Sequence, residues 1–337
     1  MIRYYFLLHY ILLGNLSIAQ KGTLYFTSKE NSRVEIHSNY VYQFSVVDSI
    51  QRKISYYTEN LPSWLYFNSA THTISGNPQK TGQYPIHLFA SNWIDTTDQF
   101  FMLTVGDKKT LNILPIGNYI TNGTSVYNSY RRDLWRLLHK GYYNFDFIGS
   151  WSLHHMGGRM PNYDFDLDHE GHSGWTISDM LHAPDWDSAR GNITKWLSLY
   201  RPDIVLVELG TNDVFQCMNM DTAFASFSKL VNILRQKNKN VKILIAQIPP
   251  LGNQWSQKKL CDTSRTYGEM VLDFNKRVAD FSILASTKHS PIFTVDQYSG
   301  VDPSKDMYDD IHPNSKGEKI MAERWFNALK PFLYKNK

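Results

Sequence analysis

The feature that most constrains the fold is an alternation of short apolar runs and helical patterns that begins after residue 110. The runs are rich in branched apolar side chains, which is typical of buried strands. Strands are expected at Leu111–Ile116, Phe145–Ile148, Asp203–Leu209, Val241–Ile248 and Ile292–Val295. Helices are expected at Ser129–His139, Ala189–Tyr200, Asp221–Lys237, Tyr267–Ala285 and Ser315–Leu333. This alternation predicts an α/β fold, with a parallel sheet covered by helices on both faces.

The chain before residue 107 has a different texture, in which β-branched and aromatic runs are separated by turn signals. The runs are Val41–Val46, Lys53–Thr58, His72–Gly76, Tyr84–Ser91 and Asp98–Val105. Their short, even spacing predicts a small all-β sandwich. The stretch Leu61–Val105 resembles the Ig-like and cadherin-like modules of secreted proteins. That resemblance implies a spacer, or a module that docks or binds carbohydrate, and the residues leave these roles open.

The first residues resemble a secretory signal peptide. Arg3 supplies a positive charge, Phe6–Leu13 is a short apolar core, and Ala19 is a small residue before a cut ahead of Gln20. An uncleaved anchor is the alternative, although the apolar run is too short to span a bilayer. The chain is thus expected to be secreted or periplasmic. The predicted organisation is a signal peptide at 1–19, an Ig-like sandwich at 20–107 and an α/β domain at 108–337.

Composition excludes some partners. The net charge of +4 over 337 residues, without a basic block, argues against nucleic acid. Aromatic residues make up 14% of the chain, which suits either sugar binding or core packing. Cys217 and Cys261 are the only cysteines, so they form either a disulfide or two buried thiols. No zinc spacing occurs, no cofactor is expected, and the sequence does not indicate an oligomeric state.

Polar motifs follow the predicted strands. The stretch GNYITNG comes after the first strand, Gly210–Asp213 (GTND) after the third, and Asp309–Asn314 (DDIHPN) before the last helix. Carboxyl ends of parallel strands meet at one edge of a sheet, so these motifs are expected to lie together. An aspartate three residues before a histidine can orient the imidazole as a general base. An asparagine side chain and backbone N–H groups can stabilise an oxyanion.

In this order, the motifs resemble the SGNH (GDSL) hydrolase superfamily over about Lys109–Phe332. The block Asp168–Ile177 (DHEGHSGWTI), a strand ending in Gly-Ser at Asp146–Ser150 and the segment Ser129–Leu138 (SYRRDLWRLL) are similar to the acetyl xylan esterases of carbohydrate esterase family three. The resemblance implies a flavodoxin-like three-layer domain. It also implies hydrolysis of acyl esters on acetylated polysaccharide or another glycan, without a metal.

The resemblance also implies roles for particular residues. His312 would be the base and Asp309 the acid that orients it, whereas Asp310 would be a solvated or capping acid. The backbone N–H of Gly174 and the side chain of Asn212 would bind the oxyanion. These roles define a predicted active site at the carboxyl edge of the sheet.

The nucleophile position departs from the family pattern. Where the family has Gly-Asp-Ser, this chain has Gly117-Asn118-Tyr119, and no shift of the alignment recovers a serine. A tyrosine hydroxyl lies roughly a ring's length further from the backbone, so His312 would not reach it and the ring would fill the acyl pocket. Ser125, Ser129 and Ser173 lie away from the nucleophile turn.

Three functions remain open after this substitution. We expect a secreted carbohydrate O-acetyl esterase fold with impaired hydrolysis. The alternative is a non-catalytic glycan-binding or adaptor protein that reuses the cleft, and a cell-surface scaffold is a third interpretation.

Two further groups are ambiguous. Five side chains invite a metal interpretation: Asp164, Asp166, Asp168, His169 and His172. The stretch lacks the glycine at the sixth position and the glutamate at the twelfth of a calcium loop, so solvated loop acids and a structural turn are the preferred interpretation, and no metal site is predicted. Trp186 and Trp255 are expected in loops near the carboxyl edge of the sheet, where they would stack on sugars or pack in loops.

Overall fold

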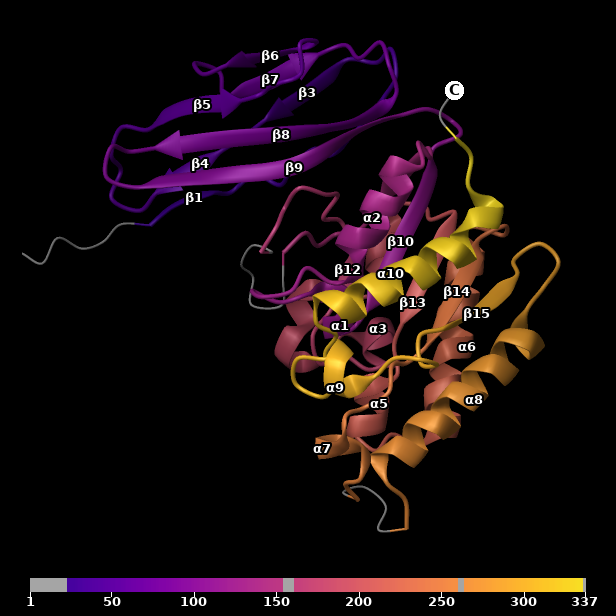
Figure 1. Ribbon diagram of the computed structural model, residues 1–337. Helices are drawn as coiled ribbons and strands as arrows, with labels where there is room; N and C mark the ends of the chain where they lie inside the picture. Colours follow the sequence, from indigo (N-terminus) through magenta and orange to yellow (C-terminus); the bar gives the residue numbers. More distant parts are fainter. Residues whose placement is uncertain (1–22, 154–160, 260–263, 336–337) are drawn as a thin grey trace, which may run out of the picture.

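In a computed structural model, the protein consists of a β-sandwich followed by an α/β domain (Figure 1). The structure describes residues 23–153, 161–259 and 264–335. The predicted signal peptide at 1–19 and Cys261 lie outside the described residues, whereas Cys217 is disulfide-bonded. In the described part of the chain, no helix has the length and apolar character needed to cross a membrane.

The sandwich has a four-stranded sheet of order β2-β9-β8-β5 and a three-stranded sheet of order β3-β7-β6, with β1 and β4 paired separately. The strands are β1 (Leu24–Phe26), β2 (Arg33–Glu35), β3 (Tyr40–Gln43), β4 (Val46–Asp48), β5 (Ser55–Glu59), β6 (Leu65–Asn68), β7 (Thr73–Gly76), β8 (Gly82–Ser91) and β9 (Thr96–Gly106). Tyr42, Phe44 and Ile74 are among its buried core side chains. The single strand predicted at Val41–Val46 is wrong, because the chain leaves β3 after Gln43 and starts β4 at Val46.

The α/β domain contains a parallel sheet of order β11-β10-β13-β14-β15, with the short β12 paired to the end of β10. The strands are β10 (Leu111–Gly117), β11 (Phe145–Phe147), β12 (Glu170–Gly171), β13 (Ile204–Glu208), β14 (Lys242–Gln247) and β15 (Ile292–Asp296). The chain order of the five long strands is therefore 2-1-3-4-5, the flavodoxin-like arrangement. This confirms the predicted fold class.

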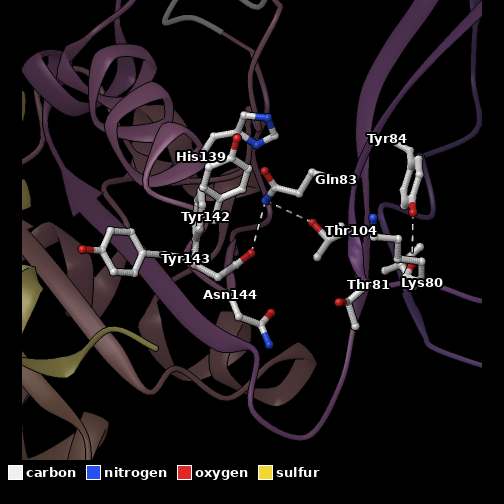
Figure 2. Close-up of a pocket in the computed structure, with 12 residues that line it drawn as sticks. Lys80, Thr81, Gln83, Tyr84, Thr104, His139, Tyr142, Tyr143 and Asn144 are labelled. Carbon is white, nitrogen blue, oxygen red and sulfur yellow. Dashed lines mark hydrogen bonds between the residues drawn. The ribbon is translucent and has the colours of Figure 1, made fainter. Parts of the chain in front are cut away.

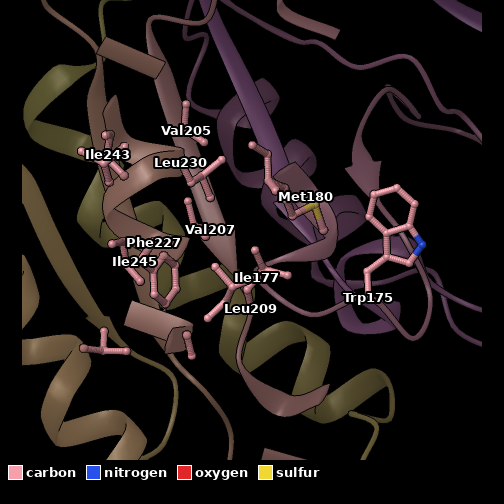
Figure 3. Packing of buried hydrophobic residues seen from close by; sticks show 14 of the residues in the cluster. Trp175, Ile177, Met180, Val205, Val207, Leu209, Phe227, Leu230, Ile243 and Ile245 are labelled. Carbon is pink, nitrogen blue, oxygen red and sulfur yellow. The ribbon is translucent and has the colours of Figure 1, made fainter. Parts of the chain in front are cut away.

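Helices cover both faces of this sheet. They are α1 (Tyr119–Asn122), α2 (Tyr130–Lys140), α3 (Asp179–His182), α4 (Ile193–Leu199), α5 (Thr211–Phe215), α6 (Met220–Lys237), α7 (Asn253–Ser256), α8 (Tyr267–Ala285), α9 (Pro303–Asp306) and α10 (Ser315–Leu329), with 3-10 turns η1 (Asp185–Arg190) and η2 (Lys330–Phe332). Side chains alternate along β13, so that Val205 and Val207 meet Phe227 of α6 on one face (Figure 3). Ile204 and Leu206 belong to the other core, with α2 and α10. Two apolar cores therefore fix the carboxyl edge of the sheet.

The helix predicted at Ala189–Tyr200 begins too early. Gly191 has a φ of 80°, a left-handed conformation that ends η1, and Asn192 then caps α4 by accepting a hydrogen bond from Lys195 N at 3.1 Å. A glycine in this conformation followed by an asparagine cap separates two short helical segments. The structural break therefore lies where the sequence pattern suggested continuity.

The sandwich lies along β11, the edge strand of the α/β sheet. Gln83 donates to the Phe145 carbonyl at 3.2 Å, and Arg33 forms an ion pair with Asp146 at 2.7 Å. Lys29 reaches the Ser150 carbonyl at 3.4 Å. These contacts occupy polar groups of a strand that would otherwise present an open edge. The contact with Ser150 extends the interface past the carboxyl end of β11.

Candidate active site

The turn after β10 presents Tyr119 at the carboxyl edge of the sheet. A Cβ on Gly117 would lie 2.1 Å from Thr121 Oγ1 and 2.7 Å from the Glu208 carbonyl oxygen, so only glycine fits there. Asn118 then caps α1, because its side-chain oxygen accepts a hydrogen bond from Ile120 N at 2.9 Å. Tyr119 is consequently held as the first residue of α1.

His312 and Asp309 form the orienting pair that the sequence predicted. The His312 Nδ1 atom lies 2.6 Å from Asp309 Oδ2, and the backbone N–H groups of Ile311 and His312 donate to Asp309 Oδ1 at 3.1 and 2.7 Å. Both the ring and the carboxylate are therefore fixed. This leaves His312 Nε2, which is buried and has no hydrogen-bond partner among the described residues.

The Tyr119 ring lies directly against this imidazole. Their centroids are 4.6 Å apart and the planes meet at 77°, an edge contact. Burial, and then the charge of Asp309, raise the pKa of Tyr119 above its usual value. The phenol therefore stays neutral near pH 7 and is a poor nucleophile.

Asp309 remains a carboxylate. Partial burial would raise its pKa, but hydrogen bonds from the side chain and backbone of His312 outweigh burial, and the pKa is lowered overall. A charged carboxylate beside Nδ1 fixes the tautomer that leaves Nε2 free to accept a proton. The Asp309 carboxylate and the His312 ring are therefore arranged as a general base and its orienting acid would be.

The two predicted oxyanion donors lie on neighbouring segments. Asn212, in α5, donates to the Trp175 carbonyl at 2.8 Å, which ties α5 to the segment that contains Gly174. Gly174 has a φ of 80°, and its carbonyl accepts a hydrogen bond from Gln216 at 3.2 Å. An amide group carries two N–H bonds, so Asn212 retains one donor for a ligand.

A cavity of about 180 Å³ joins the nucleophile turn, α5 and the His312 loop. It is lined by Asn118, Tyr119, Ile120, Thr211, Asn212, Phe215, Trp255, Ile311 and His312. Three buried atoms of these residues have no hydrogen-bond partner in the described part of the chain: Asn118 Nδ2, Thr211 Oγ1 and His312 Nε2. Buried polar atoms of this kind are normally satisfied, so they indicate where a polar ligand would bind. Gly174 is not part of this lining.

An aromatic stack that the sequence did not reveal supports the other side of His312. Tyr308 stacks on His312 with centroids 5.5 Å apart, and Tyr127 stacks on Tyr308 at 4.6 Å. Tyr119 and His312 line both the 180 Å³ cavity and a much smaller one beside Tyr127 and Tyr308. Their side chains therefore separate the two cavities. Tyr308 precedes the DDIHPN motif directly, which was the available signal for its position.

The alternative nucleophiles are not brought to the cavity. None of Ser125, Ser129 and Ser173 is among the residues that line it. Ser125 is exposed, and the backbone N–H of Ser129 is bound to Glu318 Oε1.

The acidic loop residues are held by protein groups. Asp164 pairs with Arg132 at 2.6 Å, Asp166 accepts hydrogen bonds from the backbone of Phe147 and Asp168, and Asp168 accepts one from Ser32. His169 and His172 bond to Gly171 N and to Glu170. Among the described residues, no group of three or more His, Cys, Asp or Glu side chains is arranged to hold a metal ion.

Both tryptophans considered for sugar stacking lie near the site, in short helical segments rather than in loops. Trp255, in α7, lines the cavity, and Lys258 lies 3.7 Å from its ring. Asp310 accepts a hydrogen bond from Gln254 N at 3.2 Å, which ties α7 to the His312 loop. Trp186 is exposed, and a Cβ built on Gly174 would lie 3.5 Å from its ring.

Glu208 is a buried acid behind the nucleophile turn. It is the last residue of β13, its side chain is fully buried, and neither carboxylate oxygen has a hydrogen-bond partner in the described regions. Its backbone carbonyl accepts a hydrogen bond from Asn118 N at 3.3 Å. Burial raises the pKa of Glu208 to about 8, so it is protonated at neutral pH.

Replacing Glu208 with glutamine should therefore stabilise the protein at alkaline pH. The folded state keeps a proton that the unfolded state releases above about pH 4.5, so this group makes the free energy of unfolding fall by about 1.4 kcal/mol per pH unit. The fall ends near the folded pKa of about 8. Urea unfolding at about pH 5 and about pH 9 should show a weaker pH dependence for Glu208→Gln. The exposed Glu323→Gln serves as the control, and equal slopes for the two variants would contradict the assignment.

Comparisons with known proteins give the class of this site. The GDSL-like Lipase/Acylhydrolase family model matches residues 117–320, and the "Putative Ig domain" model matches residues 23–106. The chain therefore belongs to the GDSL-like lipase/acylhydrolase family, and its sandwich is an Ig-like domain.

Particular relatives are carbohydrate esterases and other esterases. The "Multidomain esterase" of Ruminococcus flavefaciens is 31% identical over 239 residues, which cover 66% of this chain and 29% of that protein. The chain thus spans less than a third of that relative. A carbohydrate esterase family 3 structure from Talaromyces cellulolyticus and the structure of an acetyl esterase mutant with acetate ion are each 28% identical, with a TM-score of 0.52. Each match covers 66% of this chain and 97% of the other.

Proposed function

We propose that this chain recognises acylated carbohydrate at the His312 cavity and hydrolyses the acyl ester only slowly, because Tyr119 occupies the nucleophile position. The observation that carries the proposal is the edge contact, at 4.6 Å between centroids, of the Tyr119 ring with His312. The contact of His312 with Asp309 supports a base and its orienting acid, and the Tyr119 ring occupies the position of the family's serine. The likeness to carbohydrate esterases supports an acetylated polysaccharide as the substrate class.

The arrangement of Asp309, His312 and Asn212 supports direct attack of water on the ester at a low rate. Asp309 fixes the His312 ring, and His312 Nε2 takes a proton from a water molecule whose oxygen attacks the ester carbonyl carbon. The Asn212 amide, which lines the cavity, holds the resulting oxyanion, and the Gly174 N–H on the neighbouring segment is the second donor. When the intermediate collapses, the carbon–alkoxide bond breaks and the sugar oxygen takes the proton back from His312. Tyr119 forms no covalent bond in these reaction steps.

The decisive measurement is acetate release from an aryl acetate and from acetylated xylan. We expect a low wild-type rate that falls to background in His312→Ala, because this removes the histidine that lines the cavity. His289→Ala, at an exposed histidine, is the matched control and should keep the wild-type rate. Rapid turnover that survives His312→Ala would refute the proposed mechanism.

A second candidate is a non-catalytic glycan-binding protein that uses the same cavity. Three unpaired buried polar atoms beside Phe215 and Trp255 favour it, since sugars combine hydroxyl groups with apolar faces. Binding of acetylated xylo-oligosaccharide that Trp255→Ala abolishes, with no acetate release from wild type, would support this function over slow hydrolysis. For either function, the signal peptide predicted at 1–19 supports a location outside the cytoplasm.

A further inference from the structure

A second, larger cavity lies between the sandwich and the α/β domain, away from the candidate active site. Its volume is about 430 Å³, within the range of sites for small ligands. One wall comes from Lys80–Tyr84 of the sandwich, and the other comes from the end of α2 and the start of β11 (Figure 2). The start of a strand and its carboxyl edge lie at opposite ends of the sheet, about 20 Å apart for a strand as long as β10. The two cavities are therefore separate.

Tyr142 is held in this cleft by a strained backbone. Its φ is 55°, a left-handed conformation, while the preceding Gly141 is right-handed with a φ of -79°. A helix end of this kind usually places glycine or asparagine in the left-handed position. Here a tyrosine occupies it with 74% of its surface exposed. Local strain combined with an exposed aromatic ring is a combination that occurs at binding sites.

Polar side chains line both walls of this cleft. In Figure 2, Tyr142 and His139 lie on one side and Thr81 and Tyr84 on the other, with Gln83 between them. Gln83 Nε2 donates to the Phe145 carbonyl at 3.2 Å. Gln83 Oε1 is buried and accepts no hydrogen bond from any described residue, which leaves an acceptor for a ligand hydroxyl.

The charged residues of the cleft indicate which ligands it could bind. Lys80 is its cationic residue, and no aspartate or glutamate occurs among the described residues that line it. An exposed aromatic ring beside amide and hydroxyl groups suits the apolar face and hydroxyl edge of a sugar ring. The Lys80 ammonium group would also pair with the carboxylate of a sugar acid.

We propose that this cleft is a second binding site, which takes a segment of an oligosaccharide between the sandwich and the α/β domain. Tyr142 supplies the stacking surface, Gln83 accepts from a sugar hydroxyl, and Lys80 accommodates uronate substituents. A polysaccharide long enough to span both cavities would reach the His312 cavity at a raised effective concentration. The site stands independently of the proposed hydrolysis, because it shares no residue with that cavity.

Isothermal titration of the full chain with xylohexaose and with a uronate-bearing xylo-oligosaccharide tests this site. Tyr142→Gly should weaken binding by about tenfold, because the stacking contact is lost. Glycine also suits a φ of 55°, so the melting temperature should be unchanged or higher, and unfolding would not account for the loss. Tyr142→Phe should bind within about twofold of wild type because the ring is kept.

Two controls separate this cleft from other surfaces. Tyr66→Ala removes a tyrosine of similar exposure, 67%, from the sandwich and should leave binding unchanged. His312→Ala should also leave it unchanged, whether or not the chain hydrolyses esters. Tighter binding of the uronate-bearing probe that Lys80→Ala reverses would assign the charge preference to Lys80. Failure of both probes to bind, equal binding by Tyr142→Gly and wild type, or loss of binding in His312→Ala would overturn the proposal.

Discussion

Replacing Tyr119 with serine should raise the rate of acetate release by about 10³-fold or more. The substitution would place a hydroxyl on the backbone of the nucleophile turn, on the side where His312 Nε2 has no partner among the described residues. It would also remove the ring that lies 4.6 Å from the imidazole, which opens the cavity to an acyl group. Loss of the serine from a catalytic triad typically lowers turnover by about 10⁶-fold, so part of that factor should return. Initial rates with an aryl acetate and with acetylated xylan measure the gain.

Two further variants identify the cause of the gain. Tyr119→Phe keeps the ring but not the hydroxyl and should stay as slow as wild type. Adding His312→Ala to Tyr119→Ser should return the rate to background, because serine would lose its base. A folded Tyr119→Ser variant with no gain would show that the Asp309–His312 pair is not competent for ester chemistry.

The sheet was the most predictable part of the fold. A strand buried on both faces, such as β13, is a continuous apolar run, so its type and position could be read directly from the sequence. The helices α6 and α8 were also predicted within a residue or so because their apolar spacing persists over several turns. Short elements such as α1 and β12 have too few residues to show any period.

The candidate site could be predicted in part. The offset between Asp309 and His312 is local, so the chain itself indicates that the two side chains pair. The approach of Tyr119 to His312 depends on three-dimensional packing between segments almost two hundred residues apart. The positions of their motifs at the sheet edge suggested that the two lie close, and the resemblance to a family suggested their roles. Glu208 was missed because the groups that bury it come from other segments, and Tyr308 was missed because its stack on Tyr127 is a long-range contact.

The contacts between the two domains could not be predicted from the sequence. Arg33 looks like an ordinary residue of a short strand, and nothing nearby in the sequence marks Asp146 as its partner. Likewise, the strained conformation of Tyr142 depends on how α2 ends, at a position where Gly141 would be the expected left-handed residue. Long-range electrostatics and backbone strain are therefore the information that the structure adds.

Replacing Arg131 with methionine should lower the free energy of unfolding by about 3–5 kcal/mol. Arg131 lies on α2 and is fully buried. Its guanidinium donates to the Thr121, Asn122 and Leu167 carbonyls at 2.7, 3.2 and 2.8 Å. Burial lowers its pKa to about 10, so the group is still charged at neutral pH. Methionine fills a similar volume but leaves three buried carbonyls without this donor. Urea unfolding measures the loss.

The neighbouring Arg132 provides a matched control, because it lies on the same helix but pairs with the half-exposed carboxylate of Asp164 at 2.6 Å. Arg132→Met should cost less than about 1 kcal/mol. Arg131→Lys should recover little stability, since a compact ammonium group cannot reach three carbonyls at once. Equal losses for the two methionine variants would show that the buried carbonyls do not depend on Arg131.

Two of the three carbonyls that Arg131 binds belong to α1, which begins at Tyr119. Arg131→Met should therefore also lower kcat more than it raises KM in a Tyr119→Ser background, because it loosens the turn that positions the nucleophile.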